Sequence, residues 1–169
     1  MEHFHNLFDD IVIGLTVTHD NNYIFINTGK MLRQLRIKDQ KIMRDYGFAE
    51  TMYLPADFGG RPTHMHSMVV TFDNEFLFIG CRNGSFYRIN ISKQKVDKHI
   101  DYYGDQIPSI RRYQMTSFAT KTVNTMAVTR DNKQLIAVMA DGEIYKICVQ
   151  SGNLLKSILH VSPSVIKSM

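Results

Sequence analysis

The sequence has no tryptophan, four prolines and only two cysteines among its 169 residues. Two cysteines cannot form the multiple disulfides that stabilise small secreted domains. We therefore expect Cys81 and Cys148 to be reduced thiols packed as small apolar groups. No apolar run approaches the roughly 20 residues that cross a bilayer, and residues 1–10 do not have the pattern of a signal peptide. These absences predict a cytoplasmic protein without membrane association, and they leave cytoskeletal and ciliary locations open.

Basic residues are scattered along the chain, although they outnumber acidic ones. The formal net charge is +4 at pH 7 and the sequence pI is about 9.1. Clustered Lys and Arg bind phosphates, but the dense groups at 38–44 and 93–98 also contain Asp39 and Asp97. The pattern favours a solvated surface of mixed charge. Nucleic-acid binding is the least favoured of the functions considered.

One five-residue pattern, Val-Thr-x-Asp-Asn, occurs three times, at 17–21, 70–74 and 128–132. Each copy follows apolar residues in the same spacing and precedes a strand-like apolar run and a turn that contains glycine. Self-similarity of this kind indicates a repeat architecture. The hydrophobic content of 44% is that of an ordinary globular domain with a sizeable core.

Each copy predicts four antiparallel strands. The first alternates apolar and smaller residues, as a pleated strand does. The second is a continuous apolar run, which is typical of a strand buried on both faces, and the fourth is charged like a sheet edge. The second strands are predicted at Tyr23–Ile26, Phe76–Ile79 and Leu135–Val138, and the third at Met31–Leu35, Ser85–Ile89 and Glu143–Ile147.

Four such strands describe a β-propeller blade. The blades are expected at about 12–47, 65–104 and 123–160, and residues 165–169 repeat the spacing that opens a blade. The predicted fold is therefore all-β: three four-stranded antiparallel blades and the start of a fourth, within one partial propeller.

Several recurring residues are predicted to form the turns. Asp and Asn favour turns because their side chains bond to the local backbone, and Asn-Gly and Asp-Gly pairs are typical of two-residue hairpins. Equivalent aspartates in successive blades lie around a ring, so they are not expected to form a paired-carboxylate site. The predicted turn residues are Asp20, Asn21, Gly29, Asp73, Asn74, Gly84, Asp131, Asn132, Asp141 and Gly142.

All three copies resemble the WD-repeat β-propeller family, and the third copy does so most closely. Asp131-Asn132, Leu135–Val138 and Asp141–Ile147 resemble that family's second strand, tight turn and third strand. The Trp-Asp pair that names the family is absent, and Ile147-Cys148 occupies its place in this copy. The resemblance implies a rigid, noncatalytic scaffold for protein partners in an intracellular assembly, and no catalytic, cofactor or metal site carries over.

Other candidate sites are weaker. The pairs His3 with His5 and His64 with His66 have a spacing that holds metals on a strand, but no third ligand follows at a fixed spacing, so surface histidines are favoured. Tyr and Arg are enriched at interface hot spots, which favours a partner contact in the second connector. The residues of this candidate contact are Tyr102, Tyr103, Arg111, Arg112 and Tyr113.

Two questions remain open at this point, the function and the completion of the ring. The alternative function is a propeller enzyme or small-ligand binder, which would use the central channel. Three blades do not close a ring and leave sheet faces exposed. The chain is accordingly expected to be part of a larger propeller of six to eight blades, or else to pair with a second copy as a homodimer that completes a six-blade ring.

Overall fold

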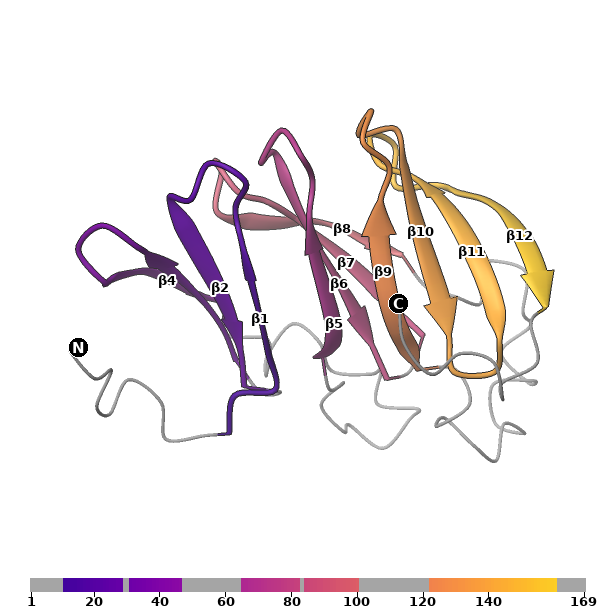
Figure 1. The fold of residues 1–169 in the computed structure, drawn as a ribbon, viewed down its shortest axis with the longest axis horizontal. Helices are drawn as coiled ribbons and strands as arrows, with labels where there is room; N and C mark the ends of the chain where they lie inside the picture. Colours follow the sequence, from indigo (N-terminus) through magenta and orange to yellow (C-terminus); the bar gives the residue numbers. More distant parts are fainter. Residues whose placement is uncertain (1–10, 29–30, 47–64, 83, 101–121, 161–169) are drawn as a thin grey trace.

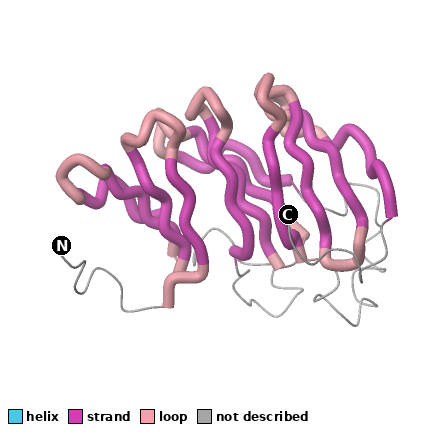
Figure 2. Tube along the Cα trace, viewed as in Figure 1, coloured by secondary structure: helices cyan, strands magenta, loops and turns pink. Residues whose placement is uncertain are grey.

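The computed structural model describes residues 11–28, 31–46, 65–82, 84–100 and 122–160. These residues form three separate four-stranded antiparallel sheets, which confirms the all-β, propeller-type prediction (Figures 1 and 2). The strands of blade 1 are β1 (Gly14–Val17), β2 (Tyr23–Asn27), β3 (Leu32–Arg36) and β4 (Lys41–Tyr46). Blade 2 contains β5 (Met65–Val70), β6 (Phe76–Cys81), β7 (Phe86–Asn90) and β8 (Lys95–Ile100). Blade 3 contains β9 (Val123–Val128), β10 (Gln134–Met139), β11 (Glu143–Cys148) and β12 (Leu154–His160).

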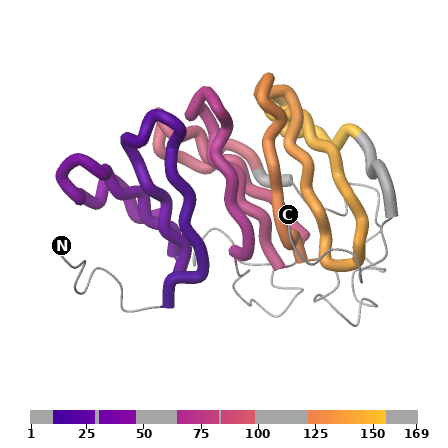
Figure 3. The backbone as a smooth tube through the Cα atoms, viewed as in Figure 1, coloured from indigo at the N-terminus to yellow at the C-terminus, as the bar shows by residue number. Residues whose placement is uncertain are grey.

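Each blade is a simple meander in which every strand pairs with the next one along the chain. The three blades lie side by side in chain order (Figure 3). Between blades, β5 contacts both β1 and β9, so the first strands lie side by side (Figure 1). The fourth strands β4, β8 and β12 are the opposite edges of their sheets.

The hairpin between β10 and β11 differs from the predicted two-residue turn. Its loop has three residues, 140–142, in which the Gly142 N–H donates to the Met139 carbonyl at 3.1 Å. Gly142 has a φ of +89°, and Gly84 has a φ of +85° in the corresponding loop of blade 2. Asp141 is not among the residues with positive φ. This is the hairpin in which a turn is followed by a left-handed glycine, so only the glycine needs positive φ.

Strands β3 and β7 begin one residue later than predicted. The carbonyls of Met31 and Ser85 accept hydrogen bonds from Thr28 and Cys81, each at 3.0 Å. These bonds close the hairpin loops, so Met31 and Ser85 belong to the loops and the strands start at Leu32 and Phe86.

The core consists of two apolar clusters, one at each joint between blades. Here the forward face of a blade is the side that packs on the next blade, and the backward face is the side toward the preceding one. Leu77 and Ile79 point from β6 toward blade 1, and Phe76 and Phe78 point toward blade 3. Because successive side chains of β6 point to opposite faces, this one strand packs in both joints, which explains its continuous apolar run.

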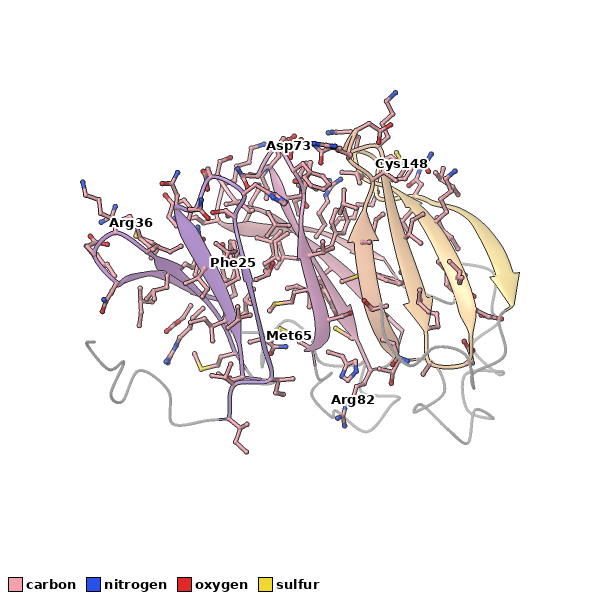
Figure 4. All side chains as sticks on the ribbon, in the orientation of Figure 1. Phe25, Arg36, Met65, Asp73, Arg82 and Cys148 are labelled. Atoms are coloured by element: carbon pink, nitrogen blue, oxygen red, sulfur yellow. The ribbon has the colours of Figure 1, made fainter. Side chains whose placement is uncertain are left out.

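The first cluster fills the joint between blades 1 and 2, where Phe25 and Met65 are labelled in Figure 4. Each fully buried large apolar side chain contributes about 1.5–3 kcal/mol. The buried residues of this joint are Phe25, Leu32, Tyr46, Met65, Val70, Leu77, Ile79, Cys81, Tyr87, Ile89 and Ile91. Those of the joint between blades 2 and 3 are Phe76, Phe78, Phe86, Val123, Leu135, Ala137, Met139, Tyr145, Ile147 and Val149.

Blades 2 and 3 approach each other closely at Gly80. A Cβ atom at this position would lie 2.5 Å from Val123 Cγ1 and 2.7 Å from Ser67 Oγ. Real Cβ atoms do not come so close to other atoms, so glycine is required by the distance between the blades.

We predict that Gly80→Ala destabilises the fold by about 1–3 kcal/mol, because the added methyl group overpacks the joint. Gly14→Ala is the matched control, since its nearest neighbour would be Met68 Cε at 3.9 Å. Urea unfolding followed by circular dichroism should show a lower midpoint for Gly80→Ala and none of that loss for Gly14→Ala. Equal losses in the two variants would contradict the close approach.

Candidate interaction surface

The turn between the first and second strands has the same hydrogen bonds in all three blades. Thr18, Thr71 and Thr129 each donate their N–H to the residue five positions later, at 2.8–2.9 Å. The aspartate two residues after each threonine accepts the N–H two residues further on, at 3.0–3.1 Å. Asp20, Asp73 and Asp131 are therefore acceptors within their own turns.

The threonine hydroxyls also act on these carboxylates. The hydroxyls of Thr71 and Thr129 donate to Asp73 and Asp131 at 2.6 Å. A hydrogen bond from the Thr129 hydroxyl, with the Lys133 N–H, lowers the pKa of Asp131. The pKa of Asp20 is lowered in the same way by Thr18 and Asn22. Hydrogen bonds to the ionised form keep both carboxylates charged at neutral pH.

The asparagines of these turns differ from the expectation of purely local bonding. Asn21, Asn74 and Asn132 adopt φ of 58°, 60° and 56°, which is the left-handed conformation that asparagine tolerates. However, Asn74 Oδ1 accepts the N–H of His19 in blade 1 at 2.6 Å. Asn132 Oδ1 likewise accepts the N–H of Phe72 in blade 2 at 2.7 Å. We call each of these two bonds an inter-blade clip.

Polar contacts also join the blades at the start of their first strands. The Met65 carbonyl accepts a hydrogen bond from Asn27 Nδ2 at 3.3 Å, and the Val123 carbonyl accepts one from Ser67 Oγ at 3.0 Å. Because the clip and these contacts lie at opposite ends of the first strands, each joint is tied at two places.

The three turns lie along one edge of the molecule, where Asp73 is labelled in Figure 4. We call this the turn edge, comprising 18–22, 71–75 and 129–133. The rings of His19 and Phe72 stack on it with centroids 4.6 Å apart and planes inclined by 22°. Phe72 is 43% exposed although it is a large apolar residue. The stack is therefore an aromatic surface that spans the first joint.

A groove of about 350 Å³ lies at the same joint. Its lining is mainly polar and includes Asp20, Asp73, Tyr23 and Gln94. The clip holds both walls, since Asn74 lines the groove and bonds to His19. The clip thus fixes the shape and the charged lining of the groove next to the aromatic stack.

Arg88 joins blades 2 and 3 at a different point. Its Nε and Nη2 donate to the two carboxylate oxygens of Asp97 at 2.9 and 3.0 Å. Its Nη1 donates to the carbonyls of Val149 and Gln150 at 2.7 and 2.6 Å. The guanidinium carbon lies 4.3 Å from the centroid of the Phe76 ring. Sequence reasoning did not identify Arg88 as a contact between blades. The available signal was a single arginine between apolar neighbours in a predicted central strand.

The cysteines are both free and their environments differ. Cys81 is buried as predicted, and burial raises the pKa of its thiol to about 12. Cys148 is partly exposed near the turn edge (Figure 4), and a hydrogen bond from the Ser151 side chain lowers its pKa. The expectation that Cys148 packs as an apolar group is wrong, because its side chain lies on the forward face of blade 3.

Several predicted residues lie outside the described ranges, and their proposed roles stay predictions. Among the residues that the structure describes, no group of three His, Cys, Asp or Glu side chains is placed to hold a metal ion. The same residues contain no helix long and apolar enough to cross a membrane. The predicted residues outside the described ranges are His3, His5, Gly29, His64, Tyr102, Tyr103, Arg111, Arg112 and Tyr113, together with the strand at 165–169.

Comparison with known proteins identifies the architecture. No protein-family model and no curated protein sequence matches the chain. Among solved structures, the WD40 repeats of RRP9 align with a TM-score of 0.69 at 15% identity, over 90% of this chain and 39% of that one. U3-55K aligns with the same score and identity, over 90% and 40%. The chain has a WD40-like propeller fold.

Hydrazine synthase of Kuenenia stuttgartiensis is also similar, with a TM-score of 0.65 at 13% identity over 95% of this chain and 40% of that one. The chain spans about two fifths of each of these structures. At these identities the likeness concerns the fold alone, which agrees with the resemblance noted in the repeats.

The asparagines of the three turns, two of which form clips, provide a matched set of variants. Replacement by glycine keeps the left-handed conformation and removes only the side chain. Asn74→Gly and Asn132→Gly should each lose about 1 kcal/mol of stability, as expected for one hydrogen bond. Asn21→Gly should not change the stability of a single chain, because within one chain no described residue bonds to its side chain. Chemical denaturation measures all three, and equal effects would show that the clips contribute nothing.

The two arginine ion pairs should also differ. Arg88→Gln should destabilise by about 3 kcal/mol, because it leaves Asp97 and two carbonyls without their donor in a largely buried place. Arg36→Gln breaks the exposed pair with Asp39 and should have no measurable effect. Thermal and urea unfolding of both variants test this contrast, and a stable Arg88→Gln protein would contradict it.

Proposed function

We propose that this protein is a noncatalytic scaffold that binds other proteins in an intracellular, cytoplasmic assembly. The observation that carries the proposal is the turn edge, where the exposed His19–Phe72 stack spans a joint beside a polar groove. Aromatic residues are enriched at interface hot spots because they bury large areas with few rotatable bonds.

Rigidity makes the turn edge suitable for binding. The His19 and Phe72 backbones are held by the clips from Asn74 and Asn132. A partner therefore does not have to order this surface when it binds, which reduces the entropic cost of association. The turn edge thus provides an aromatic anchor surrounded by charged groups.

The carboxylates of the groove support binding better than catalysis. A general acid or base needs a pKa near the working pH. The pKa of Asp20 is instead lowered, and the Asp73 carboxylate accepts bonds from the Thr71 hydroxyl and the Glu75 N–H. Both groups serve the turns, so we favour a scaffold over the alternative of a propeller enzyme or small-ligand binder.

Photo-crosslinking tests the proposal. A benzophenone amino acid at position 72 should capture discrete proteins in cells that express the chain. The same amino acid at Val96 should not, although Val96 is 37% exposed and thus comparable with Phe72. For a captured protein that is then purified, Phe72→Ala should weaken binding at least tenfold. Equal capture at both positions, or unchanged affinity, would contradict a binding site on the turn edge.

A further inference from the structure

Blade 1 exposes positions that are buried in both other blades. Ile37, Ile91 and Val149 are equivalent, since each donates its N–H to the residue just before the second strand, at 2.9–3.0 Å. Ile91 and Val149 are 5% and 0% exposed in the joints, but Ile37 is 41% exposed. In the aligned repeats Val12 corresponds to Met65 and Val123, and it is 44% exposed where they are 1% and 0%.

These exposed positions belong to one surface, the backward face of blade 1. Leu15 pairs with Ile26 and Val17 with Ile24, and directly paired residues lie on the same side of a sheet. Leu15 is 60% exposed. Phe25 lies on the other side and is buried in the first joint. Blade 1 therefore has an apolar backward face like those that blades 2 and 3 bury. Ile26 and Leu35 are buried on it, and the exposed positions named above surround them.

Blade 3 has the complementary surface at the other end. The register aligns Ile136 with Phe25 and Phe78, and Ile144 with Leu32 and Phe86. The four aligned residues are buried in the joints, whereas Ile136 and Ile144 are only partly buried. The forward face of blade 3 thus has two partly buried isoleucines beside the buried Val138 and the polar residues Gln134 and Lys146.

The polar parts of the joint are divided between the same two faces. At the joints, an N–H at position 19 or 72 donates to the asparagine of the following blade. Blade 3 offers the equivalent N–H at Arg130, and blade 1 offers the equivalent acceptor at Asn21. Within the described ranges neither group has a hydrogen-bond partner for this role. Lys146 aligns with Arg88, so blade 3 also carries a cation where blade 2 has its donor to the next blade.

We propose that blade 1 of one copy packs on blade 3 of a second copy through this joint. Blades 1 and 3 carry the two halves of an interface that the chain already forms twice internally, so a second copy can supply the complementary half to each of these two blades. In a pair, the contact forms twice, with Arg130 N–H donating to Asn21 of the other copy each time. A head-to-tail contact of this kind closes into a ring when the rotation permits, and two copies contribute six blades.

Light scattering after size exclusion tests the proposal on the full chain. The wild type should have a mass near 39 kDa, twice the 19.5 kDa of one chain. Leu15→Arg places a charge on the exposed backward face and should give a folded species of single-chain mass. Val96→Arg is the control for an added charge at an exposed strand position and should keep the double mass. A wild type of single-chain mass at every concentration would overturn the proposal, as would species that form open series without the 39 kDa form.

Mixing distinguishes this contact from a symmetric one. Leu15→Arg blocks the backward face, and Ile136→Arg blocks the forward face. Each variant alone should be a monomer, but together they retain one good joint and should form a mixed dimer. If the mixture stays monomeric while both variants are folded by circular dichroism, the head-to-tail contact is refuted.

Crosslinking covers the case in which an arginine variant does not fold. Both copies carry Cys148→Ser, one also carries Asn21→Cys and the other Arg130→Cys. A short bifunctional maleimide should join the two different copies and should not join two copies that both carry Asn21→Cys. Absence of the mixed product would overturn the proposal. The proposal would also be overturned if the mixed product became the main product only after a different protein was added. In that case a blade of the added protein would be what packs on these faces.

Discussion

Packing of one blade's face on the next is the interaction on which this structure depends. A single four-stranded sheet has two faces, and neither can be buried within the sheet itself. Phe76 and Phe78 on one side of β6 and Leu77 and Ile79 on the other place the same strand in both apolar clusters. Blade 2 is accordingly buried along the whole of β6 and β7. Blades 1 and 3 each bury one face in the described joints, so stability increases with every neighbour that a blade acquires.

Polar groups give this apolar joint its geometry. Apolar packing alone tolerates sliding and rotation, since it is nondirectional. The clips from Asn74 and Asn132, the contacts at the Met65 and Val123 carbonyls and the Arg88 contacts have directional hydrogen bonds. They hold the first strands side by side and set the spacing of the three turns. These bonds therefore determine the shape of the turn edge. Through them, the packing of the core controls the surface that is proposed to bind partners.

The repeat made much of this fold predictable, and the failures have a common cause. The continuous apolar runs Phe76–Ile79 and Leu135–Val138 predicted strands, because a strand buried on both faces needs apolar residues at every position. Asp141-Gly142 lies in a three-residue loop and not in the predicted two-residue turn, since the strand ends depend on pairing with the neighbour. Asn74 and Asn132 were interpreted as local turn formers. Glycine would suffice for φ alone, so a recurring asparagine was the available signal for a bond elsewhere.

By itself the sequence determined the three blades of the described residues, the order of their strands and the identity of the apolar residues, because these follow from local hydrophobic pattern and turn chemistry. Only the tertiary structure decided which residues meet across the joints: Asn74 with His19, Arg88 with the Val149 carbonyl, and Gly80 with Val123. These pairs are separated by about 40–60 residues, and repeat spacing says nothing about the distance or rotation between successive sheets. The physical reason is that pleating and turns are properties of neighbouring residues, whereas the joints arise from the fit of two complete faces.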